Sequence, residues 1–96
     1  MGKLRRAARL QPCSLRLPRC TADPATTVLA HLPCNRKGTG LKGPDHFAVF
    51  ACASCHRLID GPRKTAVPRE LVLERMLAGL YETQKTLIGM GLIKVE

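Results

Sequence analysis

Aromatic side chains are scarce in this chain. Its 96 residues include no Trp, one Tyr and two Phe. A chain of this length forms one small domain, and a small domain with so few large side chains buries little apolar surface. Domains of this kind commonly depend on disulfides or on a bound metal ion. The sequence therefore predicts a single domain that is held together by more than a hydrophobic core.

Long apolar segments are also missing. No segment reaches the roughly 18–20 continuous apolar residues of a transmembrane helix. Residues 1–13 are basic and lack the apolar run of a signal peptide. We therefore expect a cytoplasmic protein with no membrane association and with reduced thiols. In that compartment the five cysteines indicate metal or redox chemistry, and an odd number could not all pair as disulfides.

Acidic residues are few and unevenly placed. The chain has 16 basic and 7 acidic residues, a net charge of +9. Residues 1–44 carry nine of the basic residues and one acidic residue, so this half holds +8. Such an excess favours a polyanionic partner such as DNA, although a solubilising surface is the alternative. The expected phosphate contacts come from Arg5, Arg6, Arg9, Arg36, Lys37 and Lys42.

Local patterns predict a small α+β fold. Short runs rich in β-branched and apolar residues predict strands within 26–31 and 46–51, joined by a basic loop rich in Gly and Pro. The segment 52–60 predicts a helix that Gly61 and Pro62 end. Helical spacing of apolar residues from Pro68 to about Met90 predicts a longer helix. We expect its core-facing residues to be Leu71, Val72, Met76, Leu77, Leu80, Leu87 and Ile88.

The two ends of the chain complete this division. "LRRAARL" at 4–10 predicts a basic helical arm that Pro12 ends, and "LIKVE" at 92–96 predicts a short strand. The predicted organisation is a basic N-terminal arm at 1–12, a zinc-bound core at 13–62, and a C-terminal helical region at 63–96 that packs on the core.

Four of the cysteines have the spacing of a metal site. Two residues separate Cys52 from Cys55, so both sulfurs can reach one ion from a single turn. The natural second pair is Cys13 with Cys20, because "SLRLPR" between them can form a hairpin-like excursion; Cys34 competes for the fourth place. A redox pair would require a thioredoxin-like βαβ context, which this chain does not offer. We therefore predict a structural Zn²⁺ on these four cysteines.

The histidines come at the ends of predicted elements. His56 follows Cys55 directly, so on a helix it is turned by about 100° from the predicted ion. That direction leads towards the neighbouring strand, which ends at His31. The order of parts is a strand with a terminal histidine, a basic Gly-rich loop, a second strand, and a helix that carries a histidine.

This order resembles that of the His-Asn-His (HNH, or ββα-metal) endonucleases. The resemblance is carried by "LAH" at 29–31, "GTGLKGPD" at 38–45 and "ACASCHRLID" at 51–60, and it covers residues 3–62. It is strongest towards the small phage and prophage nucleases of the YbcO kind and the nuclease domain of the phage recombination nuclease Ref. It implies a metal-dependent DNA endonuclease that uses a divalent cation such as Mg²⁺ or Mn²⁺. It also makes a phage or host recombination protein a candidate partner.

The resemblance implies a role for three residues. His31 corresponds to the general base, and His56 to a ligand of the catalytic cation. Asparagine is expected at the middle position, where this chain offers Asp45 as an orienting group or metal ligand. The alternatives are that His31 caps a strand or binds the zinc, and that His56 is an exposed helix residue. In that case the protein is a non-catalytic zinc-ribbon module that binds DNA or assists recombination.

Overall fold

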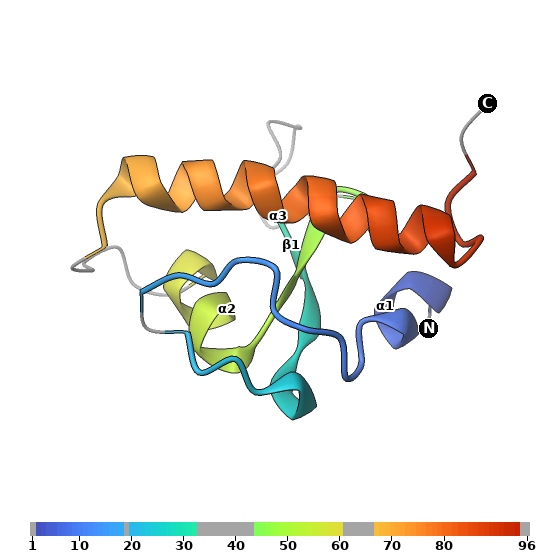
Figure 1. The fold of residues 1–96 in the computed structure, drawn as a ribbon, viewed down its shortest axis with the longest axis horizontal. Coiled ribbons are helices and arrows are strands. Elements are labelled where there is room, and N and C mark those ends of the chain that lie inside the picture. Colours follow the sequence, from blue (N-terminus) through green and yellow to red (C-terminus); the bar gives the residue numbers. More distant parts are fainter. Residues whose placement is uncertain (1, 19, 33–43, 61–66, 95–96) are drawn as a thin grey trace.

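The chain folds around a small antiparallel sheet. The structure, a computed structural model, describes residues 2–18, 20–32, 44–60 and 67–94. In these ranges the elements are α1 (Lys3–Ala7), the 3₁₀ helix η1 (Pro24–Thr26), β1 (Val28–His31), β2 (Ala48–Ala51), α2 (Ala53–Asp60) and α3 (Arg69–Gly89). Figure 1 shows α3 crossing the strands, with α2 below its first half and α1 near its last turns. The prediction of a small α+β protein is confirmed.

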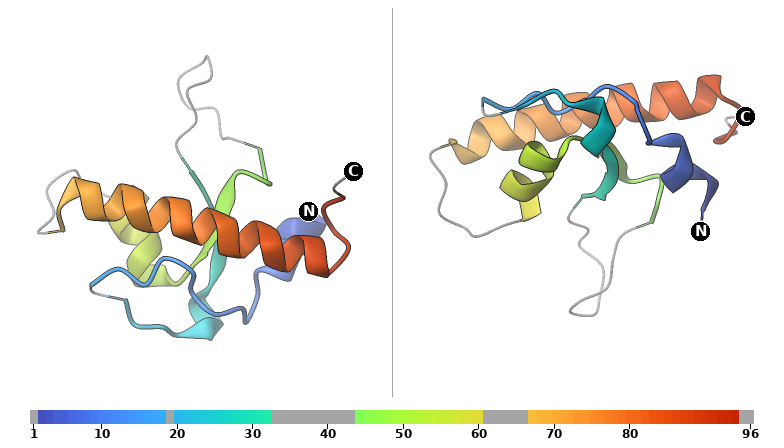
Figure 2. Two further views of the ribbon diagram at one scale, coloured as in Figure 1. Left: turned by 45° about the horizontal axis from the view of Figure 1, so that its top comes forward. Right: turned by 90° about the horizontal axis from the view of Figure 1, so that it is seen from below.

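The two strands have both faces covered. They pair antiparallel with Leu29 opposite Phe50 and His31 opposite Ala48. Because side chains alternate along a strand, Val49 and Ala51 pack with the cysteines and the first half of α3, whereas Ala48 and Phe50 pack with α1 and Leu87. All four residues of β2 are therefore buried. The two further views in Figure 2 show α1 and α2 on opposite sides of the sheet.

Helix α3 packs across the outer edge of β2 at Phe50. The backbone N–H of Phe50 donates to Thr83 Oγ1 at 3.0 Å, and its carbonyl accepts from the backbone N–H of Ser14 at 2.7 Å and from Ser14 Oγ at 2.9 Å. Ser14 and Thr83 also share a hydrogen bond of 3.2 Å between their hydroxyls. The backbone groups that face away from β1 at Phe50 are thus satisfied by side chains and by the N-terminal coil.

Close packing at this edge depends on Gly79. A Cβ atom there would come within 3.0 Å of Ser14 Oγ, 3.1 Å of the Ser14 carbonyl oxygen and 3.3 Å of Val49 Cγ1. Glycine therefore allows α3 to approach the strand and the coil together. Arg75 also joins α3 to the N-terminal coil, since its guanidinium donates to the carbonyls of Leu15 at 2.7 Å and Ser14 at 3.2 Å.

The predicted core face of the long helix was partly wrong. Met76 and Leu87 are buried as expected, but Leu77 is 71% exposed and Ile88 is 41% exposed. The reason is that the contact stripe runs through Gly79 and Thr83, next to polar backbone groups of a strand edge. No helix in the described ranges is long and apolar enough to cross a membrane.

The predicted C-terminal strand was also wrong for the part of it that is described. Residues 92–94 form no strand. Instead the chain turns back after α3, and the N–H groups of Leu92 and Ile93 donate to the carbonyl of Leu87 at 3.0 and 3.4 Å. Both side chains then pack against the cluster formed by α1 and Leu87. Gly91, with φ of +77°, makes this reversal possible.

Replacing Thr83 by Val should destabilise the fold. The substitution keeps the shape but removes the acceptor for the buried Phe50 N–H, and an unsatisfied buried donor costs about 1–3 kcal/mol. Thr86→Val, one turn away and half-buried, is the matched control and should change the free energy of unfolding by less than about 0.5 kcal/mol. Urea unfolding with metal present measures both. Equal effects from the two variants would contradict the role assigned to Thr83.

Candidate metal centre and candidate active site

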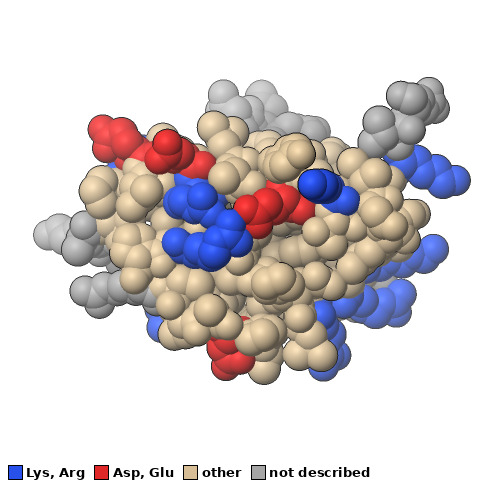
Figure 3. All heavy atoms as spheres, viewed as in Figure 1, with Lys and Arg blue, Asp and Glu red and all other residues tan. Residues whose placement is uncertain are grey.

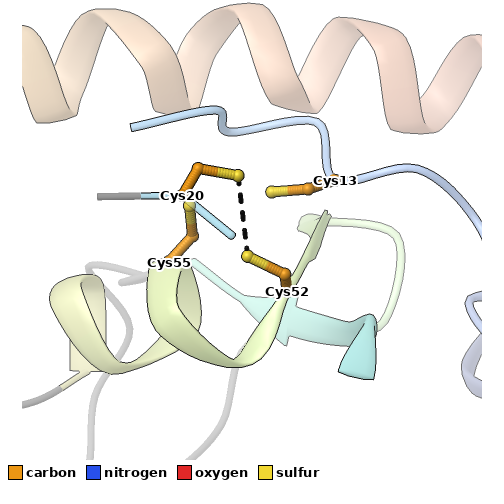
Figure 4. A group of neighbouring side chains, drawn as sticks. All are labelled: Cys13, Cys20, Cys52 and Cys55. Atoms are coloured by element: carbon orange, nitrogen blue, oxygen red, sulfur yellow. Dashed lines mark hydrogen bonds between the residues drawn. The ribbon is translucent and has the colours of Figure 1, made fainter. Parts of the chain in front are cut away.

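Four cysteine sulfurs from separate segments meet beneath α3. Cys13 and Cys20 come from the N-terminal coil, and Cys52 and Cys55 from the start of α2 (Figure 4). All four Sγ atoms lie within 4.8 Å of one another, and those of Cys20 and Cys52 are 3.6 Å apart. Sulfurs around a tetrahedral Zn²⁺ at 2.3 Å would be about 3.8 Å apart. The four cysteines can therefore hold a metal ion, as the spacing predicted.

Hydrogen bonds between the segments fix the approach of the sulfurs. The N–H of Ala53, at the start of α2, donates to Thr26 Oγ1 at 3.0 Å. The N–H of Thr21 donates to Ser54 Oγ at 3.2 Å. Cys20 is brought round by a turn in which its N–H donates to the carbonyl of Leu17 at 2.8 Å. These contacts join the turn after Cys20 to the first turn of α2, so the two cysteine pairs face each other.

Burial and hydrogen bonding together make the thiols differ in acidity. Burial would raise the pKa of Cys52, but hydrogen bonds from Ser54, the Cys55 N–H, Thr21 and Cys20 lower that pKa to about 5. Burial raises the pKa of Cys55 and of Cys20. Thiolates, not thiols, are metal ligands. A cation bound here must displace protons from the two thiols with raised pKa values, so its affinity should increase with pH.

His31 and Asp45 form a second polar site at the other end of β1. His31 Nε2 lies 2.7 Å from Asp45 Oδ1, and the two side chains are 14% and 31% exposed. The hydrogen bond from His31, helped by the positive charge of Arg5, holds the pKa of Asp45 below its usual value. Arg5 Nε lies 3.5 Å from the same oxygen. The sequence predicted His31 and Asp45 as site residues but gave no sign that Arg5 reaches them.

The remaining predicted site residues are placed as follows. His56 lies on α2 one residue after Cys55 and is half-buried, outside the sulfur cluster. Among the described residues, the ligand atoms of His31, Asp45 and His56 do not converge as those of the cysteines do. The role of His56 therefore stays a prediction. The predicted phosphate contacts Arg6 and Arg9 are exposed, whereas Cys34, Arg36, Lys37 and Lys42 lie outside the described residues.

Comparison with known proteins now identifies the family. Residues 2–92 match the family model described as "Putative nuclease YbcO". The chain belongs to the YbcO family. It is 41% identical to the "Putative nuclease YbcO" of Escherichia coli (strain K12) and to that of Enterobacteria phage 82, in each case over 98% of this chain and 99% of the relative. The predicted resemblance to YbcO-type proteins is confirmed, and the wider HNH resemblance stays a prediction.

A solved structure shares the fold of this YbcO family member. It is described as "Structure of a putative bacteriophage protein from Escherichia coli str. K-12 substr. MG1655". The TM-score is 0.75 at 38% identity, and the match covers 93% of this chain and all of the other. The arrangement of strands and helices described above is therefore also that of a relative from a bacterial genome.

Removing the metal should unfold or strongly destabilise the protein. Because the four sulfurs link three segments of a small domain, we expect about one metal ion per chain and a sharply lower melting temperature after chelation. Cys13→Ala should lose the ion, whereas Cys34→Ala is the matched control and should retain it. Metal analysis and thermal unfolding measure both variants. Loss of the ion in Cys34→Ala but not in Cys13→Ala would mean that Cys34, and not Cys13, is the fourth ligand.

Proposed function

We propose that this chain is a metal-dependent DNA endonuclease with an HNH-type ββα-metal core. The observation that carries the proposal is the contact of 2.7 Å between His31 Nε2 and Asp45 Oδ1 at the end of β1. A histidine oriented by a carboxylate is a recurring arrangement for a general base. The names of the relatives, which call them putative nucleases, support the same reaction class.

Asp45 fixes which nitrogen of His31 acts as the base. Its lowered pKa keeps the carboxylate ionised at neutral pH, so it accepts hydrogen bonds and does not donate them. Nε2 of a neutral His31 therefore carries the proton and donates a hydrogen bond to Asp45 Oδ1. The lone pair of the imidazole is left on Nδ1, which is the atom that can take a proton from water.

Hydrolysis then requires one proton transfer to His31. As the oxygen of the water attacks phosphorus, its proton passes to Nδ1, and the new P–O bond forms while the bond from phosphorus to the 3′-oxygen breaks. The leaving oxygen takes a proton from solvent, which gives a 3′-hydroxyl and a 5′-phosphate. Asp45 stabilises the imidazolium that forms, because its negative charge lies against the ring.

Two metal ions belong to the proposal. Four thiolate ligands favour Zn²⁺, and in a cluster without an open position that ion is structural. A catalytic divalent cation such as Mg²⁺ or Mn²⁺ is proposed at His56, where it would supply positive charge to the phosphate. Since no three described ligands converge there, water and phosphate oxygens would have to complete its coordination, as is usual for Mg²⁺.

The surface charge suits a duplex held by its phosphates. Figure 3 shows Lys and Arg side chains gathered at the end of the molecule where α1 lies, with no acidic side chain beside them on this face. Arg6 and Arg9 are exposed there. Contacts to phosphates position a protein on DNA without reading its sequence. We therefore propose DNA binding with weak sequence preference.

His31→Ala should abolish nicking of a supercoiled plasmid. Loss of a general base typically lowers the rate about 10²–10⁴-fold, and it should leave DNA affinity and zinc content nearly unchanged. His46→Ala is the matched control, because His46 is an exposed histidine of the same turn as Asp45. The assay is run across Mg²⁺, Mn²⁺ and Ni²⁺. A zinc-loaded wild type that binds DNA but never nicks it would favour the zinc-ribbon alternative.

Neutralising Arg6 and Arg9 together should weaken binding of unrelated DNA sequences to a similar extent. Each lost phosphate contact should reduce the slope of log affinity against log salt by about 0.9. The matched control is Arg69→Gln with Lys85→Gln, which removes the same charge from exposed positions of α3. Fluorescence anisotropy at several salt concentrations measures both. A loss confined to one DNA sequence would instead mean that the N-terminal arginines read bases.

A further inference from the structure

The carboxylate of Asp45 lies against the N-terminal end of α1. His31 Nε2 and Arg5 Nε both lie against Oδ1, at 2.7 and 3.5 Å. On the other side, a Cβ atom at Gly2 would come within 3.0 Å of Oδ2. Asp45 therefore joins the end of β1 to the first helix of the chain, and residues far apart in sequence surround one carboxylate.

Packing holds Arg5 at this position. On either side of it in the sequence, Leu4 and Ala7 pack against the cluster that contains Leu29, Phe50 and Leu87, and Ala8 is fully buried in that cluster. An exposed ion pair alone would contribute little to this placement. Because α1 is docked by apolar contacts, the backbone of Arg5 is held where its side chain reaches Asp45, the partner of His31.

The guanidinium retains hydrogen-bonding capacity. Arg5 contacts Asp45 through Nε, its side chain is 43% exposed, and no described residue accepts a hydrogen bond from its two terminal nitrogens. A planar guanidinium presents paired N–H groups that match the oxygens of a phosphate. Arg6 and Arg9, by contrast, form no ion pair with any described residue.

We propose that Arg5 is a substrate-binding residue of the His31 site, distinct from the other N-terminal arginines. Its terminal N–H groups would donate to a non-bridging oxygen of the phosphodiester that is cleaved, while Nε keeps Asp45 against His31. This inference rests on the proposed nuclease function and makes it more specific. It assigns to Arg5 a contact that strengthens as negative charge develops on the phosphate.

The kinetic test compares Arg5→Gln with Lys3→Gln. Both remove one positive charge from α1, and Lys3 is exposed. Loss of a donor to developing charge should lower kcat of Arg5→Gln about 10²-fold at saturating DNA, with little change in melting temperature. Lys3→Gln should keep the wild-type kcat. Arg5→Lys should recover only part of the rate, because an ammonium keeps the charge but not the paired geometry. Lys3→Gln is expected to change KM at most. An Arg5→Gln variant that likewise changes KM and keeps the wild-type kcat would overturn the proposal.

A binding experiment separates this inference from the nuclease proposal. The arginine Nε–H signals of ¹⁵N-labelled, zinc-loaded protein are followed by NMR while the dinucleotide thymidylyl-thymidine is added without further divalent cation. The Arg5 signal, assigned with Arg5→Lys, should shift more than those of Arg6 and Arg9. If it stays in place while theirs move, Arg5 does not bind the phosphodiester, even if the wild type cleaves DNA. If it shifts but the wild type never cleaves, the nuclease proposal fails and the phosphate contact stands.

Discussion

The position of Cys52 is the constraint on which the rest of the molecule depends. This residue follows β2 directly, precedes α2, and contributes its sulfur to the four-cysteine cluster. Two residues earlier, Phe50 is hydrogen-bonded to both Ser14 and Thr83. A strand held at both points cannot slip in register without breaking buried polar contacts. Since Ala48 of that strand lies opposite His31, the place of the candidate base follows from the place of the cysteines.

Part of the positive charge that the composition suggests for DNA binding is instead paired within the fold. Arg16 pairs with Glu82 of α3 and donates to the carbonyl of Cys13 at 3.1 Å. The hydrogen bond with Glu82 raises the pKa of Arg16, and the nearby thiols of Cys13 and Cys20 contribute to the same effect. Four thiolates around a divalent metal ion carry a net charge of −2. The positive charge of Arg16 at this position would offset that negative charge. Net charge alone therefore overstates the basic surface that is available to a nucleic acid.

What the sequence could predict was local. The strands and α2 have apolar or β-branched runs with clear ends, and the cysteine spacing predicted the four cysteines whose sulfurs lie together, with Cys34 as the alternative for the fourth place. The contact face of α3 could not be found in this way. Apolar periodicity favours Leu77, whereas a helix that crosses a strand edge needs a glycine for close approach and a hydroxyl for the backbone N–H. Gly79 and Thr83 meet those needs, yet in the sequence they look like interruptions of the apolar pattern.

The contact between Arg5 and Asp45 lies beyond sequence reasoning for a different reason. The two are 40 positions apart in the sequence, and no spacing rule connects them. The composition groups Arg5 with Arg6 and Arg9 because all three lie in one basic segment. Only the docking of Leu4, Ala7 and Ala8 onto the sheet turns one of the three towards His31. In a chain with so few large side chains, a short helix docked by small apolar residues is enough to give one arginine a different neighbour from the next.

This architecture also determines which experiments can separate structure from chemistry. The cysteine cluster follows β2 and His31 pairs with Ala48 of β2, so removing an ion held by the cysteines would be expected to disturb the strand that places His31 beside Asp45. Loss of activity on chelation would therefore be the same for a catalytic ion and for a structural one. Substitutions at the His31 end avoid this ambiguity, because their side chains are partly exposed and contact none of the four sulfurs. The proposed chemistry is thus best tested at the end of β1 that lies away from the four cysteines.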